Sequence, residues 1–220
     1  MELLKLNQVS YRYEKAEKHV LNNITCSFEA GKLYCVKGAS GAGKSTLLSL
    51  IAGLDIPTSG EILYDGVDIT KMNRDDYRAK KMGVIFQGYN LLENATAAEN
   101  IMLAVNISGK KISIEEIYSL LSEVGINQEK AERKVVKLSG GEQQRVAIAR
   151  AIAGGSPILA ADEPTGNLDT DNEAAIMVIF RRLAQEMDKC VIAVTHSQKA
   201  VTYADEVLFL NKGSLGAEKQ

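Results

Sequence analysis

Residues 33–53, LYCVKGASGAGKSTLLSLIAG, decide the fold that we expect for this chain. The apolar residues 33–37 are typical of a strand, and residues 44–52 are typical of a helix that ends at Gly53. The glycine-rich loop between them matches the pattern G-x-x-x-x-G-K-[ST] over residues 38–45. That pattern cradles phosphates when it joins a strand directly to a helix, as it does here. The stretch therefore predicts a loop that binds a nucleoside triphosphate.

The residue types in this loop have chemical roles. Gly38, Gly41 and Gly43 let the backbone curl so that successive N–H groups point inward and form a nest for the triphosphate. The N-terminus of the following helix adds roughly half a positive charge. Lys44 neutralises the β- and γ-phosphates, and the Ser45 hydroxyl ligates Mg²⁺. The predicted nucleotide contacts from this loop are Gly38, Ala39, Ser40, Gly41, Ala42, Gly43, Lys44, Ser45 and Thr46.

Composition narrows the class of protein. A chain of 220 residues, 45% hydrophobic and 25% charged, is long enough for one well-buried domain. The formal net charge of −2 argues against a basic face, so we expect no nucleic-acid partner. Three scattered cysteines without a C-x-x-C pair fit a reducing cytoplasm and do not indicate a zinc site.

No sequence signal points to insertion into a membrane. The N-terminus, MELLKLNQVSYRYEK, has no basic region leading into a long apolar core, so we expect no signal peptide. No apolar run approaches the roughly 18 residues that cross a bilayer. We therefore expect a chain that is soluble when expressed alone and that reaches a membrane by docking on a partner.

The order of the expected elements indicates an α/β fold with a β-rich start and a helical insertion. Asp65-Gly66 is a strong hairpin signal between two early strands. Capping-box patterns at residues 96–99 and 113–116 start helices inside an insert of about residues 88–156. After it, strands and helices alternate, which implies a parallel sheet with crossover helices. The expected strands are residues 3–9, 24–28, 33–37, 61–64, 67–69, 83–86, 158–161, 191–194 and 207–210, and a late helix is expected at residues 171–187.

Polar residues at the ends of three expected strands are candidates for metal and water chemistry. Asp162 is placed to hold Mg²⁺ through its water shell. Glu163 would then point toward the γ-phosphate and polarise an attacking water as general base. Gln87 could reach Mg²⁺ or that water through its amide oxygen, and His196 could hydrogen-bond the γ-phosphate. Each residue taken alone is more typical of a polar surface or strand end, so it is the phosphate loop that favours the catalytic interpretation.

The stretch LSGGEQQR, residues 138–145, resembles a second phosphate-binding loop. Ser139 and Glu142 form a capping-box pattern, which explains both residues structurally. Capping does not explain Gly140 and Gly141, because each glycine in a helix costs about 1 kcal/mol relative to alanine. Two glycines in a first turn suggest that a ligand approaches there. Because the chain's own γ-phosphate is already surrounded, we expect this loop to bind the ATP of a second copy arranged head to tail.

Taken together, these motifs resemble those of the ATP-binding cassette (ABC) ATPases. The phosphate loop, Gln87, LSGGEQQR, LAADEP, GNLD and His196 follow one another as in that family, and the resemblance covers essentially the whole chain. The stretches FQGYNLL, ATAAEN and DEPTGNLD look most like the MacB- and LolD-like motor subunits of macrolide export and lipoprotein release. Glu142 replaces the glutamine common in the wider family, and Ser197 stands where this branch often has aspartate. Neither departure removes a catalytic group.

The resemblance implies a fold and a set of residue roles. The implied fold is a RecA-like P-loop core with an N-terminal antiparallel β subdomain and an inserted helical subdomain, in one cassette over residues 1–220. Tyr13 would stack on adenine, with Tyr11 the less favoured candidate, and Asp169 in GNLD would lie in the loop that crosses the dimer seam. The implied catalytic residues are Glu163, His196 and Gln87, and the implied Mg²⁺ ligands are Ser45, Gln87 and Asp162.

The resemblance also implies partners and a location. ATP and Mg²⁺ would be the cofactors, and the chain would be a motor subunit at the cytoplasmic face of the cell membrane. A groove near Gln87 and the helical insert resembles the socket for a coupling helix of a transmembrane permease. The family also allows a periplasmic or extracellular adaptor that is reached through the permease.

Other functions stay open at this point. A mechanical or regulatory ATPase could remodel an envelope complex without moving a substrate. A soluble cassette of DNA repair or translation is disfavoured, because the chain lacks a second cassette and a basic patch. A phosphate-loop kinase or GTPase would leave LSGGEQQR unexplained. The resemblance favours export, and peptides, lipoproteins, macrolides and bacteriocins are all open as cargo.

Overall fold

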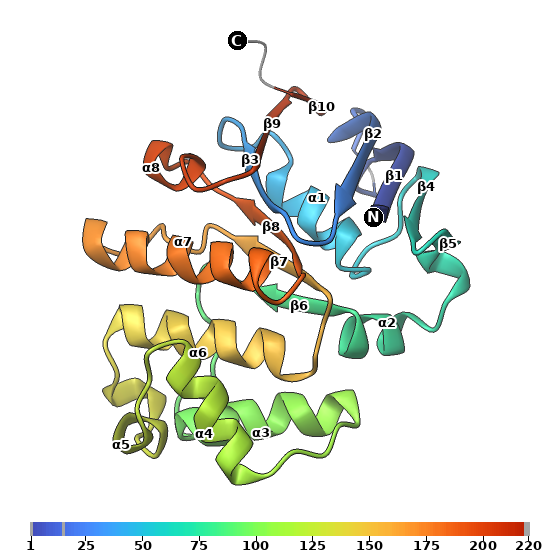
Figure 1. The fold of residues 1–220 in the computed structure, drawn as a ribbon. Coiled ribbons are helices and arrows are strands. Elements are labelled where there is room, and N and C mark those ends of the chain that lie inside the picture. The colour runs from blue at the N-terminus through green and yellow to red at the C-terminus, as the bar shows by residue number, and fades with distance from the viewer. Residues whose placement is uncertain (1, 15, 218–220) are drawn as a thin grey trace.

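The computed structural model describes residues 2–14 and 16–217, which form two sheets and a group of helices (Figure 1). The larger sheet has the strand order β10-β9-β3-β8-β7-β6. Its strands are parallel from β9 to β6, whereas β10 pairs antiparallel with β9. The expected α/β fold is thereby confirmed. The strands are β3 (Leu33–Lys37), β6 (Met82–Ile85), β7 (Ile158–Asp162), β8 (Cys190–Val194), β9 (Glu206–Asn211) and β10 (Ser214–Ala217).

Both faces of the larger sheet are buried. Successive residues of β3 point to opposite faces, so that Leu33 belongs to one hydrophobic core and Tyr34 to the other. The first core includes the inward faces of α6 (Gly140–Ala153) and α7 (Thr170–Gln185), and the second includes α1 (Lys44–Ile51). A strand covered on both faces is apolar throughout, which explains why β3, β7 and β8 appear in the sequence as continuous apolar runs.

The smaller sheet is antiparallel, with the order β2-β1-β4-β5. Its strands are β1 (Glu2–Tyr11), β2 (Leu21–Glu29), β4 (Ser59–Tyr64) and β5 (Val67–Asp68). Asp65 and Gly66 join β4 to β5 with φ values of 49° and 76°, as a type I′ turn requires, and the predicted hairpin is confirmed. The prediction of a strand through Ile69 is wrong at its last residue. The Asp68 side chain caps a 3₁₀ helix, η1 (Ile69–Lys71), which ends the strand there.

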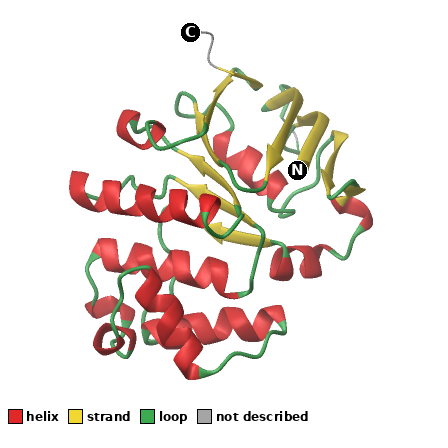
Figure 2. Cartoon of the chain, viewed as in Figure 1, coloured by secondary structure: helices red, strands yellow, loops and turns green. Residues whose placement is uncertain are grey.

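The helices α3 to α6 gather on the side of the molecule away from the smaller sheet (Figures 1 and 2). They are α3 (Ala97–Ser108), α4 (Ile114–Glu123), α5 (Gln128–Ala131) and α6, with a 3₁₀ turn, η2 (Val135–Lys137), before α6. The capping boxes at Thr96, Ser113 and Ser139 all form. Helix α6 contacts α3, α4 and β6, so it joins this group to the larger sheet. The helical insertion is confirmed, and its bounds of about residues 88–156 as a subdomain stay a prediction.

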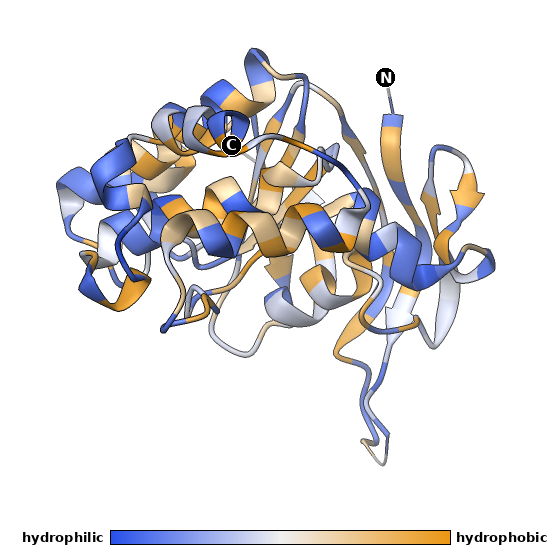
Figure 3. Ribbon diagram, turned by 90° about the horizontal axis from the view of Figure 1, so that it is seen from below, coloured by the Kyte–Doolittle hydropathy of each residue, from blue (hydrophilic) through white to orange (hydrophobic). Residues whose placement is uncertain are grey.

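Two further helices are short. They are α2 (Arg74–Lys80), capped by Asn73, and α8 (Gln198–Val201), capped by Ser197. Two basic side chains on α2 pair with acidic ones on the same helix, Arg78 with Asp75 and Lys80 with Asp76. These pairs join residues three or four positions apart, which are neighbours on one side of a helix. Figure 3 shows hydrophilic and hydrophobic residues alternating along the larger helices, as amphipathic helices on a core require.

The three cysteines are free thiols inside the fold. Cys35 and Cys190 are buried and Cys26 is partly buried. Burial raises the pKa of each of these thiols to about 12. All three therefore stay protonated near neutral pH, which makes them poor nucleophiles.

Gly83 in β6 offers a test of how tightly α6 is held on the larger sheet. A Cβ on Gly83 would lie 2.4 Å from the carbonyl oxygen of Ala151 and 2.5 Å from Cδ2 of Leu159. We expect Gly83→Ala to lower the free energy of unfolding by about 1–3 kcal/mol, because this overpacking must displace the α6 backbone. Urea denaturation measures the change. Gly216→Ala is the control, since a Cβ there would meet no atom within 4 Å, and equal stability of the two variants would contradict the packing argument.

Candidate functional site

A cleft of about 710 Å³ lies at the carboxyl ends of β3, β6, β7 and β8. Parallel strands bring their carboxyl ends to one edge of a sheet, and ligands of α/β proteins bind at that edge. The volume suits a small-molecule ligand. The lining residues are Tyr13, Val20, Ser40, Gly41, Gly43, Lys44, Ser45, Thr46, Gln87, Asp162, Glu163, Gly166 and His196.

Most of the site residues expected from the sequence meet in this cleft. Gly38, Ala39 and Ala42 of the loop do not line it, and their contact with nucleotide stays a prediction. Val20 and Gly166 line it and were not expected. Gly166 lies within DEPTGNLD, a stretch that the sequence did single out, whereas Val20 precedes β2 without any motif to reveal it.

The phosphate loop has a backbone that favours glycine. Gly41 and Gly43 have φ values of 75° and 101°, in the left-handed region. At Gly38 the limit is space, because a Cβ there would lie 2.3 Å from the carbonyl oxygen of Leu210 in β9. Gly43 is the N-cap of α1, and no side chain caps that helix. The first N–H groups of α1 are therefore available to an anion.

Lys44 brings a buried positive charge to the loop. Its Nζ donates to the carbonyl oxygens of Gly38 at 3.0 Å and Ala39 at 3.1 Å, and lies 2.9 Å from Nε2 of His196. These partners are uncharged main-chain oxygens and a ring nitrogen. A phosphate oxygen would be a stronger partner, since its negative charge adds Coulomb attraction to the ammonium.

Glu163 and His196 form a carboxylate–imidazole pair beside Lys44. Glu163 Oε1 lies 3.2 Å from His196 Nε2, and the main-chain N–H of His196 donates to Glu163 Oε2 at 3.2 Å. Glu163 has φ 47°, which is uncommon for a residue other than glycine and is typical of functional sites. Its own N–H donates to the carbonyl oxygen of Val194 at 3.0 Å. A carboxylate held in this way can accept a proton from a water in the cleft.

Three oxygen-bearing side chains in the cleft fit a magnesium ion. Ser45 is in the first turn of α1, Gln87 follows β6 and Asp162 ends β7, and all three line the cleft. Hydroxyl, amide and carboxylate oxygens suit this hard cation. Within residues 2–14 and 16–217, no three His, Cys, Asp or Glu side chains group as a metal site. An ion here would therefore complete its coordination with phosphate oxygens and water.

Tyr13 presents an aromatic ring at the edge of the cleft. It is 49% exposed, and its hydroxyl lies 2.8 Å from Oγ1 of Thr46 in α1. Its ring meets that of Tyr11 edge to face, with centroids 5.1 Å apart. Of these two tyrosines, only Tyr13 lines the cleft, so its ring is the one placed to stack on a base.

The LSGGEQQR loop begins α6 and does not line the cleft of its own chain. Ser139 Oγ accepts the N–H of Glu142 at 3.3 Å, and Glu142 Oε2 accepts the N–H of Ser139 at 2.8 Å. Glu142 Oε1 lies 2.7 Å from Nζ of Lys130, and the hydrogen bond from Lys130 lowers the pKa of the Glu142 carboxyl. Both oxygens of Glu142 are therefore engaged within the chain, and its predicted contact with nucleotide stays untested.

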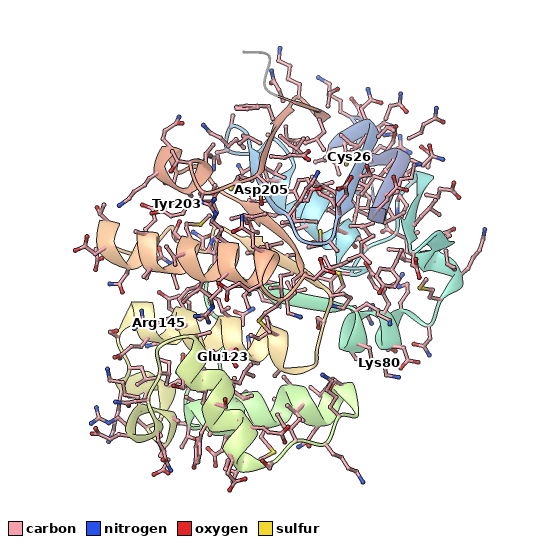
Figure 4. All side chains as sticks on the ribbon, in the orientation of Figure 1. Cys26, Lys80, Glu123, Arg145, Tyr203 and Asp205 are labelled. Carbon is pink, nitrogen blue, oxygen red and sulfur yellow. The ribbon has the colours of Figure 1, made fainter. Side chains whose placement is uncertain are left out.

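Packing within the chain accounts for one of the two glycines. A Cβ on Gly141 would lie 2.5 Å from Oδ1 of Asn172 in α7, so a side chain there would have to displace the Asn172 side chain, which is bonded to Asp169. Arg145 of α6, labelled in Figure 4, donates from Nη1 to the same oxygen at 3.4 Å. A Cβ on Gly140 would lie 3.1 Å from the hydroxyl of Tyr89. Ligand approach is therefore not needed to explain Gly141, although it was the reason given by the sequence for both glycines.

Asp169 is the N-cap of α7 and does not line the cleft. Its Oδ1 accepts the N–H groups of Asp171 and Asn172 at 3.1 and 2.9 Å, and its Oδ2 accepts Nδ2 of Asn172 at 2.8 Å. The bonds from Asn172 lower the pKa of the Asp169 carboxyl. The predicted position of Asp169 at a dimer seam stays a prediction.

Comparison with known proteins agrees with this geometry. The family model described as ABC transporter matches residues 21–166. The ABC transporter ATP-binding protein YclH of Bacillus subtilis is 44% identical over 97% of this chain and 96% of its own length. The lipoprotein-releasing system ATP-binding protein LolD of Porphyromonas gingivalis is 38% identical over 90% of this chain and 93% of its own. The dimeric ATP-binding cassette MJ0796, bound to ADP and Pi, superposes with a TM-score of 0.89 at 32% identity over 99% of this chain and 98% of that one.

Lys44 provides the test of the cleft as a phosphate site. We expect Lys44→Ala to abolish measurable binding of MgATP, because the β- and γ-phosphates lose their nearest cation. Isothermal titration calorimetry measures the affinity. Lys37→Ala is the matched control, because Lys37 ends β3 close by but bonds to Gln198 and does not line the cleft. Wild-type affinity in Lys44→Ala would remove the phosphate assignment.

Proposed function

The chain belongs to the ABC transporter family, and we propose the residues and partners through which it performs the work of that family. It is the ATP-hydrolysing motor subunit of an ABC transporter and acts as a dimer. One observation carries the proposed residue roles. The ring nitrogen Nε2 of His196 lies 2.9 Å from the ammonium of Lys44 and 3.2 Å from the carboxylate of Glu163.

The proposed binding mode divides ATP between two parts of the cleft. Tyr13, which is 49% exposed, stacks on adenine at the edge of the cleft. The N–H groups of the phosphate loop and of the start of α1 surround the phosphates. Lys44 leaves its carbonyl partners on Gly38 and Ala39 for the β- and γ-phosphates, where charge pairs with charge.

The proposed reaction is attack of water on the γ-phosphate, which yields ADP and phosphate. Glu163 takes the proton from that water, and the main-chain N–H of His196 holds its Oε2 in place. The His196 ring donates to the γ-phosphate, and Gln87 orients the water. Mg²⁺, held by Ser45, Gln87 and Asp162 when bound, supplies positive charge to the phosphate oxygens.

The proposed dimer completes each site with the partner's LSGGEQQR loop. In the described chain, the N–H groups of Gly140 and Gly141 donate to no acceptor, at the start of a helix of 14 residues. Free donors at such a helix N-terminus bind anions. Because this loop does not line the cleft of its own chain, we assign it to the γ-phosphate of ATP in the second copy, with Asp169 at the seam.

The proposed membrane partner is a transmembrane permease. A groove of about 240 Å³ lies between α2, β6 and α3, and its walls include Leu103 and Ile107, which are 41% and 63% exposed. Exposed apolar side chains beside a groove suit an inserted helix. Among the described helices, none has the length and apolar character needed to span a membrane. Docking of a permease segment here would place the chain at the cytoplasmic face.

The cargo and the direction of transport remain part of this proposal. One relative is named for a lipoprotein-releasing system. We accordingly assign export of a peptide, lipoprotein or antibiotic type of cargo, which the permease binds, and any adaptor would contact the permease rather than this chain.

Glu163→Gln tests the dimer and the base together. Removing the charge stops the attack of water and leaves the loops intact, so bound ATP persists between two chains. We expect Glu163→Gln to be monomeric without nucleotide and to form a stable dimer with MgATP, as measured by multi-angle light scattering. Adding Ser139→Arg should prevent that dimer, because the side chain fills the space of the partner's γ-phosphate.

The matched control is Glu186→Gln, which changes an exposed carboxylate after α7. It should hydrolyse ATP at the wild-type rate and form no lasting dimer. A monomeric Glu163→Gln at saturating MgATP would count against binding in trans. Wild-type hydrolysis by Glu163→Gln would instead show that Glu163 is not the base.

Tyr13 tests the adenine assignment. Stacking on a base is worth about 1–3 kcal/mol, so Tyr13→Ala should raise the KM for ATP about tenfold while kcat at saturation is unchanged. Tyr13→Phe keeps the ring and loses only the bond to Thr46, so it should retain most of the affinity. Steady-state ATPase assays measure both constants, and a loss of kcat at constant KM in Tyr13→Ala would show that Tyr13 is misassigned.

A further inference from the structure

The guanidinium of Arg150 in α6 donates hydrogen bonds to two carbonyl groups in the segment that follows Gln87. Its Nη1 donates to the carbonyl oxygen of Asn90 at 2.6 Å, and its Nη2 donates to that of Tyr89 at 3.0 Å. The rigid, planar guanidinium can hold two oxygens at once in a defined orientation, which a lysine ammonium cannot do in the same way.

The two residues that Arg150 holds have an unusual backbone. Tyr89 and Asn90 have φ values of 59° and 51°, so two consecutive residues other than glycine lie in the left-handed region. Such conformations are sparsely populated and persist only when neighbouring groups hold them. The turn itself contributes hydrogen bonds from the Tyr89 N–H to Phe86 O at 3.1 Å and from the Asn90 N–H to Gly88 O at 2.6 Å. Arg150 adds the contacts from outside the turn.

No ion pair in the described chain accounts for the position of Arg150. Its side chain is half-buried, and among the described residues it forms no ion pair with a carboxylate. Burial lowers the pKa of its guanidinium, the direction expected for a cation without an anionic partner. Hydrogen bonds to the two carbonyl oxygens therefore offset the cost of desolvating the Arg150 guanidinium.

The turn touches both parts of the proposed ATP machinery. It begins two residues after Gln87, which lines the cleft. At its other side, the Tyr89 hydroxyl is 3.1 Å from the position that a Cβ on Gly140 would take, at the start of the LSGGEQQR helix. Movement of this turn would therefore displace Gln87 in the cleft.

We propose that Arg150 is a positioning residue that sets Gln87 in the cleft by holding the Tyr89–Asn90 turn. Arg150 does not line the cleft, so it acts through the turn and not on nucleotide. This inference rests on the proposed role of Gln87 in orienting the attacking water. Arg150 also lines the groove beside α3, so it contacts both that groove and the segment that follows Gln87.

The test is steady-state ATPase activity of the purified full chain. Arg150→Ala should lower kcat about tenfold and change the KM for ATP by less than about threefold, because Gln87 orients the attacking water, while Ser45 and Asp162 stay in place to hold Mg²⁺. Arg150→Lys should give an intermediate kcat, since one ammonium keeps the charge but not the fork. Arg182→Ala is the matched control. Arg182 also donates to a main-chain carbonyl, that of Glu123, far from the turn, and its kcat should stay at the wild-type value.

A double-mutant cycle with Gln87→Ala separates positioning from a general structural role. If Arg150 acts through Gln87, adding Arg150→Ala to Gln87→Ala should change kcat by less than about twofold. If the losses in kcat of the two single variants multiply in the double variant, the inference is overturned. So would a kcat in Arg150→Ala equal to that of Arg182→Ala while Gln87→Ala is impaired. A wild-type kcat in Gln87→Ala would instead remove the proposed role of Gln87, which distinguishes the two failures.

Thermal unfolding of each variant shows whether a change in kcat comes from loss of the folded structure. We expect Arg150→Lys to unfold at the wild-type temperature, so its intermediate kcat can be read even if Arg150→Ala is unstable. A wild-type kcat in a well-folded Arg150→Lys, together with a poorly folded Arg150→Ala, would assign Arg150 to stability and overturn the positioning role.

Discussion

The phosphate loop begins beside β9, where only glycine fits, since a Cβ on Gly38 would lie 2.3 Å from the carbonyl oxygen of Leu210. This close approach aims the loop at the carboxyl edge of the sheet and lets α1 start at Gly43 with φ 101°. Lys44 then points into the cleft instead of into solvent. The ends of β6, β7 and β8 meet the loop at the same edge, so the polar residues that follow those strands share one site.

Three of the eight described residues other than glycine that have a positive φ lie in this site or in the segment that follows Gln87. Glu163, Tyr89 and Asn90 are all left-handed residues other than glycine, and conformations of this kind cost of order 1–3 kcal/mol each. Each has a holding contact from a distant part of the chain. The N–H of His196 holds the Glu163 carboxylate, and the guanidinium of Arg150 holds the carbonyl oxygens of Tyr89 and Asn90. The chain therefore loses some folding stability at these residues and gains a fixed geometry where water and phosphate would meet.

The LSGGEQQR stretch combines a packing role within its own chain with the binding role proposed for it. Gly141 lets α6 lie against Asn172 of α7, while the free N–H groups of Gly140 and Gly141 stay available to an anion. Lys130 and Ser139 fix the Glu142 side chain, which completes the cap. A loop held this firmly within its own chain can meet a second chain without first having to become ordered, which lowers the entropic cost of association.

The sequence by itself determined the local chemistry of this protein. The strand–loop–helix at residues 33–53, the Asp65-Gly66 hairpin turn and the three capping boxes depend on residues a few positions apart, and the order of motifs along the chain identifies the family. The tertiary structure alone decided the strand order, and with it the meeting of Lys44, Glu163 and His196. It also decided that Arg150 holds a turn 60 residues away in the sequence. Contacts at such separations depend on how helices and sheets pack, and no short pattern of residue types records that packing.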